Sequence, residues 1–183
     1  HDEVIRAQQL KLLGKALPAA DMGMVLDLLP LAHGLDPMLR LPALLQVFPA
    51  LRRLSLAERR ALEKLAERLI RIDEHIDVFE FCLARLLATL LRDEIEARAP
   101  HGNVALATAA ADLQVLFSVM ARFGARNERE ARMAYEAGMH TVLPMERPPY
   151  AAVEDWPTRL GESLRRLEKL HPFAKKVLIE GLA

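Results

Sequence analysis

Cysteine and aromatic residues are scarce in this chain of 183 residues. Cys82 is the only cysteine, and aromatic residues make up 5% of the sequence. A single cysteine excludes an intrachain disulfide framework and fits a reducing compartment. The sequence has no stretch of strand-like alternation, and its apolar content is mostly Leu and Ala, which are strong helix formers. These patterns predict an all-α fold.

An excess of basic charge is also missing, because Lys plus Arg and Asp plus Glu both number 25. This balance argues against a nucleic-acid-binding protein, which normally carries a basic excess. No uninterrupted apolar run approaches the roughly 18–20 residues that cross a bilayer, so no membrane span is expected. The chain opens His-Asp-Glu, without an initiator Met or the order of a signal peptide. We expect a piece of a longer protein, with a processed mature chain as the alternative.

Sequence patterns of catalysis are lacking as well. The six histidines stand at positions 1, 33, 75, 101, 140 and 171. None is four residues from another, so this chain does not contain the His-Glu-x-x-His helix of zinc peptidases. No serine lies in a Gly-x-Ser-x-Gly elbow, and the glycines form no phosphate-binding loop. We expect no catalytic residue and no bound cofactor here; the alternative is a site assembled from residues distant in sequence.

The clearest pattern present is a pair of amphipathic helices over Ser55–Arg98, joined by a short acidic turn. Apolar residues recur every three or four positions on both sides of the turn. Three residue pairs have the spacing of a capping box, which gives acceptors to the unpaired N–H groups of a first helical turn. These pairs are Ser55/Glu58, Asp77/Glu80 and Asn127/Glu130. We expect a helical hairpin around which the fold is organised.

Proline divides the rest of the chain. Residues 1–54 are rich in Leu and Pro, and Pro42 and Pro49 predict two short helices or a kinked one. Residues 104–123 are long and nearly uncharged, which is typical of a buried core helix. We expect an orthogonal bundle of about seven to nine helices. In it, a short-helix segment (1–54) packs on a helical core domain (55–183), and together they form one globular unit.

A second proline-rich stretch, Pro144–Tyr150, contains three prolines and cannot continue a helix. We expect an ordered connection or a surface loop there, followed by a helix that Asp155 caps. Tyr150 and Trp156 near this stretch either anchor a partner or pack on the core. Paired basic residues along the chain indicate solvated helix faces or, grouped on one side, contact with anionic lipid headgroups.

The acidic turn is the candidate metal site of the sequence. Five potential ligands fall within eight residues: Asp73, Glu74, His75, Asp77 and Glu80. Oxygen ligands at this density suit calcium or magnesium, and histidine adds a softer ligand. We take Asp73, Asp77 and Glu80 as the candidate metal ligands, although the turn lacks the length and the glycine of an EF-hand loop. The alternative is that Asp77 and Glu80 cap a helix and the other carboxylates are solvated.

Cys82 lies between Phe81 and Leu83 in the second helix of the expected hairpin. We expect it to be a small core residue rather than a nucleophile, because apolar burial raises the pKa of a thiol and blocks access to it.

Leu44–Leu91 and Leu160–Ala183 resemble a known family, most clearly in the pattern ALRRLSLAERRALEKLAERLIRIDEHIDVFEFCLARLL of residues 50–87. The likeness is to the C-terminal cytoplasmic region of bacterial integral-membrane zinc metallopeptidases of the CAAX prenyl endopeptidase and HtpX type. Ile76–Glu80 and Leu83–Leu87 match its motif, and the acidic turn also resembles that of the tellurite-resistance TerB-like helical domain. Glu74-His75 stand where Asp-Gly is usual. Only Asp77 and Glu80 match family positions with a possible function.

The resemblance implies a parent that is a membrane-embedded zinc endopeptidase, with this region on the cytoplasmic face of the bacterial inner membrane. The zinc site and the membrane spans of that parent lie outside this chain. The first hypothesis is therefore a non-catalytic accessory domain that recruits a partner or substrate, or regulates the protease domain. The second is a stand-alone TerB-like scaffold that binds proteins, with or without a metal at the acidic turn. An all-α enzyme with a dispersed site ranks third.

Overall fold

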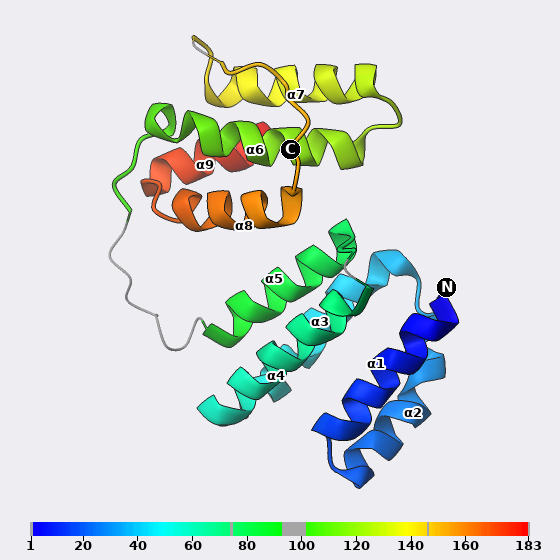
Figure 1. Ribbon diagram of the computed structural model, residues 1–183. Coiled ribbons are helices and arrows are strands. Elements are labelled where there is room, and N and C mark those ends of the chain that lie inside the picture. Colours follow the sequence, from blue (N-terminus) through cyan, green and yellow to red (C-terminus); the bar gives the residue numbers. More distant parts are fainter. Residues whose placement is uncertain (1, 74, 93–101, 146, 183) are drawn as a thin grey trace. The chain divides into compact units, whose positions relative to one another are not determined.

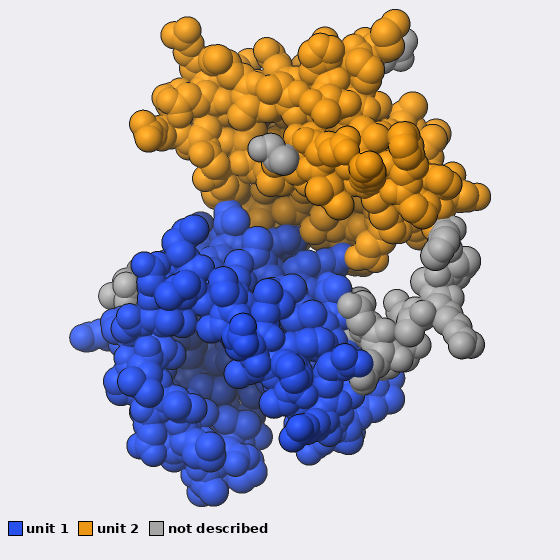
Figure 2. Space-filling view, turned by 180° about the vertical axis from the view of Figure 1, so that it is seen from behind, with its two compact units in different colours: residues 1–97 blue, residues 98–183 orange. Residues whose placement is uncertain are grey.

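The computed structural model describes residues 2–73, 75–92, 102–145 and 147–182. These residues form nine α-helices, two short 3₁₀ helices and no strand, which confirms the all-α prediction (Figure 1). The chain divides into two compact units, residues 1–97 and residues 98–183 (Figure 2). This division lies at 97/98, whereas the scheme drawn from the sequence divides the chain at 54/55.

Unit 1 contains the expected hairpin and the helices before it. Its elements are α1 (Asp2–Ala16), α2 (Ala19–Gly34), α3 (Pro37–Leu51), α4 (Leu56–Ile70), the 3₁₀ turn η1 (Arg71–Asp73) and α5 (Val78–Arg92). Helices α4 and α5 pack against each other as the hairpin, while α1 contacts α4 and η1, and α3 contacts α5. These contacts place the Leu/Pro-rich segment and the hairpin in one compact unit. Glu74 and residues 93–98 of the expected hairpin lie outside the described residues.

Helix α4 begins with the capping box that the sequence predicts. The backbone N–H of Ser55 donates to Glu58 Oε2 at 2.7 Å, and the N–H of Glu58 donates to Ser55 Oγ at 3.3 Å. Both side chains thus satisfy N–H groups that have no partner within the helix. The start of the hairpin is therefore fixed by two residues three positions apart.

Prolines do not break the helices of the first quarter. Of the two alternatives for Pro42 and Pro49, two short helices or one helix, the structure has one helix. Pro42 and Pro49 both lie inside the continuous helix α3, and Pro30 lies inside α2. Each proline removes the hydrogen bond to the carbonyl four residues earlier, at Leu26, Met38 and Leu45. Those three residues are 49–82% exposed. Because solvent reaches this side of the helices, water can replace the lost donors.

Unit 2 has its own core around α6. Its elements are the 3₁₀ turn η2 (Leu106–Ala109), α6 (Ala110–Gly124), α7 (Glu128–Val142), α8 (Trp156–Leu167) and α9 (Pro172–Leu182). Helix α6 lies between α7 and α8, and α7 also contacts α9 (Figure 1). Seven residues of α6 are buried. The predicted core helix is therefore present, although its α-helical part begins only at Ala110.

Hydrogen bonds connect α8 to α6, and the segment before η2 to the turn between α8 and α9. The Asp112 carboxylate on α6 accepts from Arg166 Nε on α8 at 2.8 Å. Val104 pairs in parallel with Leu170 between α8 and α9, through Val104 N–H to Lys169 O at 3.1 Å and His171 N–H to Val104 O at 2.9 Å. The segment that enters the unit is thus tied to the turn before its last helix.

The proline-rich stretch lies across α6 and α7 as an ordered connection. The Tyr135 hydroxyl on α7 donates to Pro148 O at 2.6 Å, and Gln114 Nε2 on α6 donates to Pro149 O at 2.7 Å. Tyr150 packs edge to face on the Tyr135 ring, with ring centroids 5.5 Å apart. Burial raises the pKa of Tyr135 to about 12, so its hydroxyl stays a donor at neutral pH.

Trp156 packs on unit 2 at the start of α8, and Asp155 before it does not cap that helix. Trp156 packs edge to face on Phe123, with ring centroids 5.0 Å apart. Trp156 and Tyr150 therefore both pack on other residues of unit 2. Asp155 precedes α8 in a left-handed conformation with φ of 43°, and its side chain makes no capping hydrogen bond. The expectation that Asp155 caps this helix is wrong, because that backbone conformation is not the extended one of a capping residue.

One continuous helical segment, Leu106–Gly124, is long and apolar enough to cross a membrane by length and composition alone. It consists of η2 and α6, and α6 packs against α7 and α8. A buried core helix meets the same criterion, so the criterion by itself assigns no membrane span.

Helices α7 and α9 approach closely at Gly138. A Cβ atom at this position would lie 2.5 Å from Phe117 Cε1 and 2.9 Å from the backbone oxygen of Gly181. We expect Gly138→Ala to lower the free energy of unfolding of unit 2 by about 1–3 kcal/mol, because the packed helices must separate. Urea unfolding followed by the fluorescence of Trp156, the single tryptophan, measures this change.

Gly124→Ala is the matched control, since no atom lies within 4 Å of its added Cβ. It should leave stability unchanged or raise it by up to about 1 kcal/mol. Equal destabilisation by the two substitutions would show that helix packing at Gly138 is not the cause.

Candidate functional site

The acidic turn between α4 and α5 is held by hydrogen bonds of its own carboxylates. Asp73 Oδ1 accepts from the backbone N–H of His75 at 3.2 Å. Asp77 Oδ1 accepts from Glu80 N–H at 2.7 Å, and Glu80 Oε2 accepts from Asp77 N–H at 3.2 Å. The predicted Asp77/Glu80 capping box is therefore present at the start of α5. Each of the three candidate metal ligands has one oxygen bonded to a backbone N–H group.

A metal site at this turn stays a prediction. Among the described residues, no group of three or more His, Cys, Asp and Glu side chains is placed to hold a metal ion. Glu74, one of the five potential ligands, lies outside those residues. The hydrogen bonds of Asp73, Asp77 and Glu80 favour the alternative in which these carboxylates close a turn and begin a helix.

The two capping boxes of the hairpin differ in their electrostatics. Hydrogen bonds from the Ser55 side chain and backbone lower the pKa of Glu58. Burial raises the pKa of Glu80, and the carboxylates of Asp77 and Asp73 raise it further against the opposing effect of the Asp77 N–H bond. The hydrogen bonds of the capping box favour the charged form of both glutamates, but at Glu80 burial outweighs them.

Cys82 is exposed, which contradicts its expected place in the core. The reason is that neighbouring residues in an α-helix point about 100° apart, so Cys82 is exposed although Phe81 and Leu83 beside it are half-buried. Partial desolvation and then the Asp77 carboxylate raise the pKa of its thiol. A raised pKa disfavours the thiolate that nucleophilic chemistry requires.

The buried serines of unit 2 also lack the contacts of an activated nucleophile. Ser118 on α6 and Ser163 on α8 are 2% and 1% exposed. The described residues provide no hydrogen-bond partner for either hydroxyl. A nucleophilic serine needs a base within hydrogen-bond distance.

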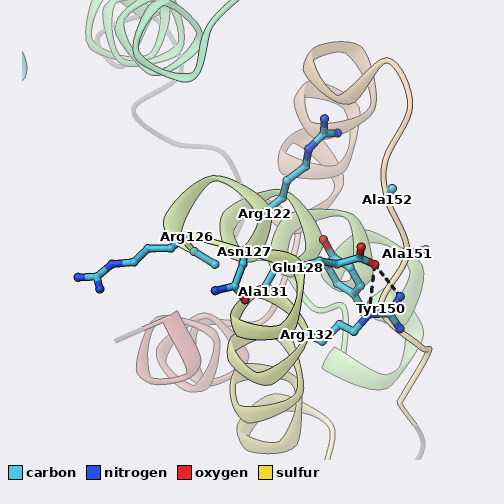
Figure 3. A pocket seen from close by; sticks show the side chains of 10 residues that line it. Arg122, Arg126, Asn127, Glu128, Ala131, Arg132, Tyr150, Ala151 and Ala152 are labelled. Carbon is cyan, nitrogen blue, oxygen red and sulfur yellow. Dashed lines mark hydrogen bonds and ion pairs between the residues drawn. The ribbon is translucent and has the colours of Figure 1, made fainter.

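A pocket of about 590 Å³ lies where α6 ends and α7 begins (Figure 3). Arg122, Asn127, Glu128, Arg132 and Tyr150 are among its lining residues. Arg132 Nη2 contacts Glu128 Oε1 at 2.7 Å, and the Arg132 guanidinium lies 5.6 Å from the centroid of the Tyr150 ring. The pocket therefore contains an ion pair and an aromatic face, which suit binding of a polar group.

No pattern in the sequence indicates this pocket. Asn127 was expected only as a helix cap, and its Oδ1 indeed accepts from Glu130 N–H at 2.9 Å. Tyr150 reaches the pocket from the proline-rich stretch, through its packing on Tyr135. Because Tyr150 is far in sequence from the residues of α6 and α7 that line the pocket, no local sequence pattern predicts the pocket.

Comparison with protein-family models, with curated proteins and with solved structures finds no match for this chain. The resemblance to the C-terminal region of membrane zinc peptidases therefore stays a prediction.

Asp77→Ala tests the capping role of the acidic turn. Loss of the acceptor for Glu80 N–H should lower the free energy of unfolding by about 1 kcal/mol, with Ser55→Ala as the matched substitution in the other box. Circular dichroism during urea unfolding measures both changes in stability.

If the acidic turn binds metal, calcium or zinc will raise the melting temperature of the wild-type chain and not that of Asp73→Asn or Asp77→Asn. Absence of any calorimetric heat with either metal would contradict the metal prediction.

The opposite pKa shifts predict opposite pH dependences for Glu58→Gln and Glu80→Gln. The stability that Glu58 contributes is present above its ordinary pKa of 4.5 and is lost as the pH falls. The contribution of Glu80 is largest at acid pH and is lost as the pH rises above 4.5 through the raised pKa. From acid to neutral pH, Glu58→Gln should become less stable relative to wild type, and Glu80→Gln more stable. If the curves of unfolding free energy against pH run parallel for the wild type and the two variants, both predictions are contradicted.

Proposed function

We propose that this chain is a non-catalytic helical accessory domain of a membrane-bound zinc-dependent endopeptidase. In this role it recruits a partner or substrate, or regulates the protease domain. The observation that carries the proposal is that large apolar residues of α2 and α3 in unit 1 are exposed, and we call these residues the α2–α3 surface. This surface gives a physical reason for an interaction role, and the resemblance at the hairpin suggests which protein the partner belongs to.

Helices α2 and α3 are rich in apolar residues and yet bury none of them fully. Leu31 and Met38, one near the end of α2 and one at the start of α3, are 72% and 82% exposed. Further large apolar residues of the two helices are at least 49% exposed, namely Met24, Leu26, Leu28, Leu39, Leu45 and Val47. Isolated exposed apolar residues are ordinary, but eight on two consecutive helices are typical of a surface that contacts another protein.

The partner that we propose for this surface is the protease portion of the same parent chain. Met24, Leu28 and Leu31 follow one another at four and three residues, which places them along one face of α2. An exposed apolar stripe of this kind packs readily into a groove or against another helix. An accessory domain joined to its enzyme meets such a partner at high effective concentration.

The full-length reading frame tests this proposal directly. An upstream His-Glu-x-x-His motif with several apolar spans would support it. Their absence would leave the second candidate, a stand-alone TerB-like scaffold that uses the same apolar surface to bind other proteins.

Substitution of the exposed apolar residues should separate binding from folding. The double variant Leu31→Ser/Met38→Ser should change the free energy of unfolding by about 0.5 kcal/mol or less per site, because both side chains are exposed. Its association with the co-expressed protease portion should weaken by about tenfold or more, which is the loss of a contact of about 1.4 kcal/mol.

Met145→Ser is the control, since Met145 in unit 2 is 90% exposed. It should retain wild-type association when detergent-solubilised complexes are captured and their dissociation constants measured. Equal binding by all three chains would overturn the role of the α2–α3 surface.

A further inference from the structure

A basic groove in unit 1 lies between α1 and the end of α4. It has a volume of about 380 Å³ and is lined by Lys11 and Lys15 of α1, Arg68 of α4 and Arg71 of η1. Leu12 and Ile72 give the groove an apolar part. No acidic side chain among the described residues lines it.

Among the described residues that line the groove, the four cations have no carboxylate beside them. Among the described residues, the side chains of Lys11, Lys15, Arg68 and Arg71 form no ion pair and no hydrogen bond. In contrast, Arg132 and Arg166 in unit 2 are each paired with carboxylates. Like charges brought together from two helices repel one another, and a bound anion would relieve this repulsion.

Helix dipoles explain only part of this arrangement. Lys15 and Arg68 lie in the last turns of α1 and α4, and Arg71 follows α4 directly. Cations at these places offset the negative end of a helix. Lys11 lies a full turn before the end of α1, where this effect has faded. A structural role at helix ends therefore leaves Lys11 and the common location of all four cations unexplained.

We propose that the groove binds a phosphate group, in the form of a free phosphate anion or a lipid headgroup. Phosphate suits the site better than a single carboxylate does, because it carries more charge and more acceptor oxygens. The forked guanidinium groups of Arg68 and Arg71 match phosphate geometry, and the lysines add point charges. Leu12 and Ile72 offer contact to an apolar group attached to the phosphate. This proposal is independent of the function proposed above.

The experiment compares the wild-type chain with Lys11→Gln/Arg71→Gln. Inorganic pyrophosphate is titrated calorimetrically, and vesicles of phosphatidylcholine with and without phosphatidylglycerol are tested by co-sedimentation, all at one ionic strength. Each cation near an anionic surface contributes about 1 kcal/mol, or about fivefold. We expect the double variant to bind about 25-fold more weakly than the wild type in the measurement, pyrophosphate titration or vesicle co-sedimentation, in which the wild type binds. That measurement identifies the source of the phosphate.

Lys64→Gln is the matched control, because it removes one exposed cation from α4 outside the lining of the groove. It should bind within about twofold of the wild type, and Lys11→Arg/Arg71→Lys should restore most of the lost binding. Circular dichroism checks the fold of each variant. If Lys11→Gln/Arg71→Gln does not fold, the single variant Lys11→Gln takes its place. Absence of wild-type binding in both measurements, equal loss in Lys64→Gln, or equally tight binding of succinate would overturn the proposal.

Discussion

The structure depends on how its helices satisfy the N–H groups of their first turns. An all-helical chain has no ladder to pair these groups, so they bond to side chains close by in sequence or to water. Helices α2, α6 and α8 begin without a side-chain cap. Ser55 with Glu58, Asp77 with Glu80, and Asn127 with Glu130 supply such side chains at the starts of α4, α5 and α7. Each pair fixes the position at which a helix begins. The acidic turn is one instance of this constraint, and its carboxylates have a structural reason to be there.

Features with local causes could be predicted from the sequence. The three capping pairs and the apolar stretch that became α6 each act within a few residues, so their patterns were sufficient. The course of α2 and α3 could not be predicted, because tolerance of Pro30, Pro42 and Pro49 depends on the exposure of the carbonyl that loses its donor. Cys82 was misplaced for a related reason: its exposure depends on which side of α5 it occupies, and not on the apolar residues beside it.

The candidate binding sites depend on residues that are far apart in the sequence. The groove of unit 1 combines Lys11 with Arg71, and the pocket of unit 2 combines Arg122 with Tyr150. In the sequence, such basic residues have the pattern of solvated helix faces. Only the packing of α1 on α4, and of the proline-rich stretch on α6 and α7, brings them together. The acidic turn has the pattern of a metal site because its carboxylates are close together in the sequence, and a turn closed by those carboxylates has the same pattern.

The two units differ in how far their own residues supply a core. In unit 2, α6 alone buries seven residues, and Tyr135, Leu113 and Met139 are almost completely enclosed. In unit 1, helices α2, α3 and α4 have no buried residue, although Leu is abundant in all three. Apolar area left in water contributes nothing to folding, and its removal from water by a binding partner is favourable. Unit 1 therefore has more to gain from a binding partner than unit 2, and both proposed interaction surfaces lie on it.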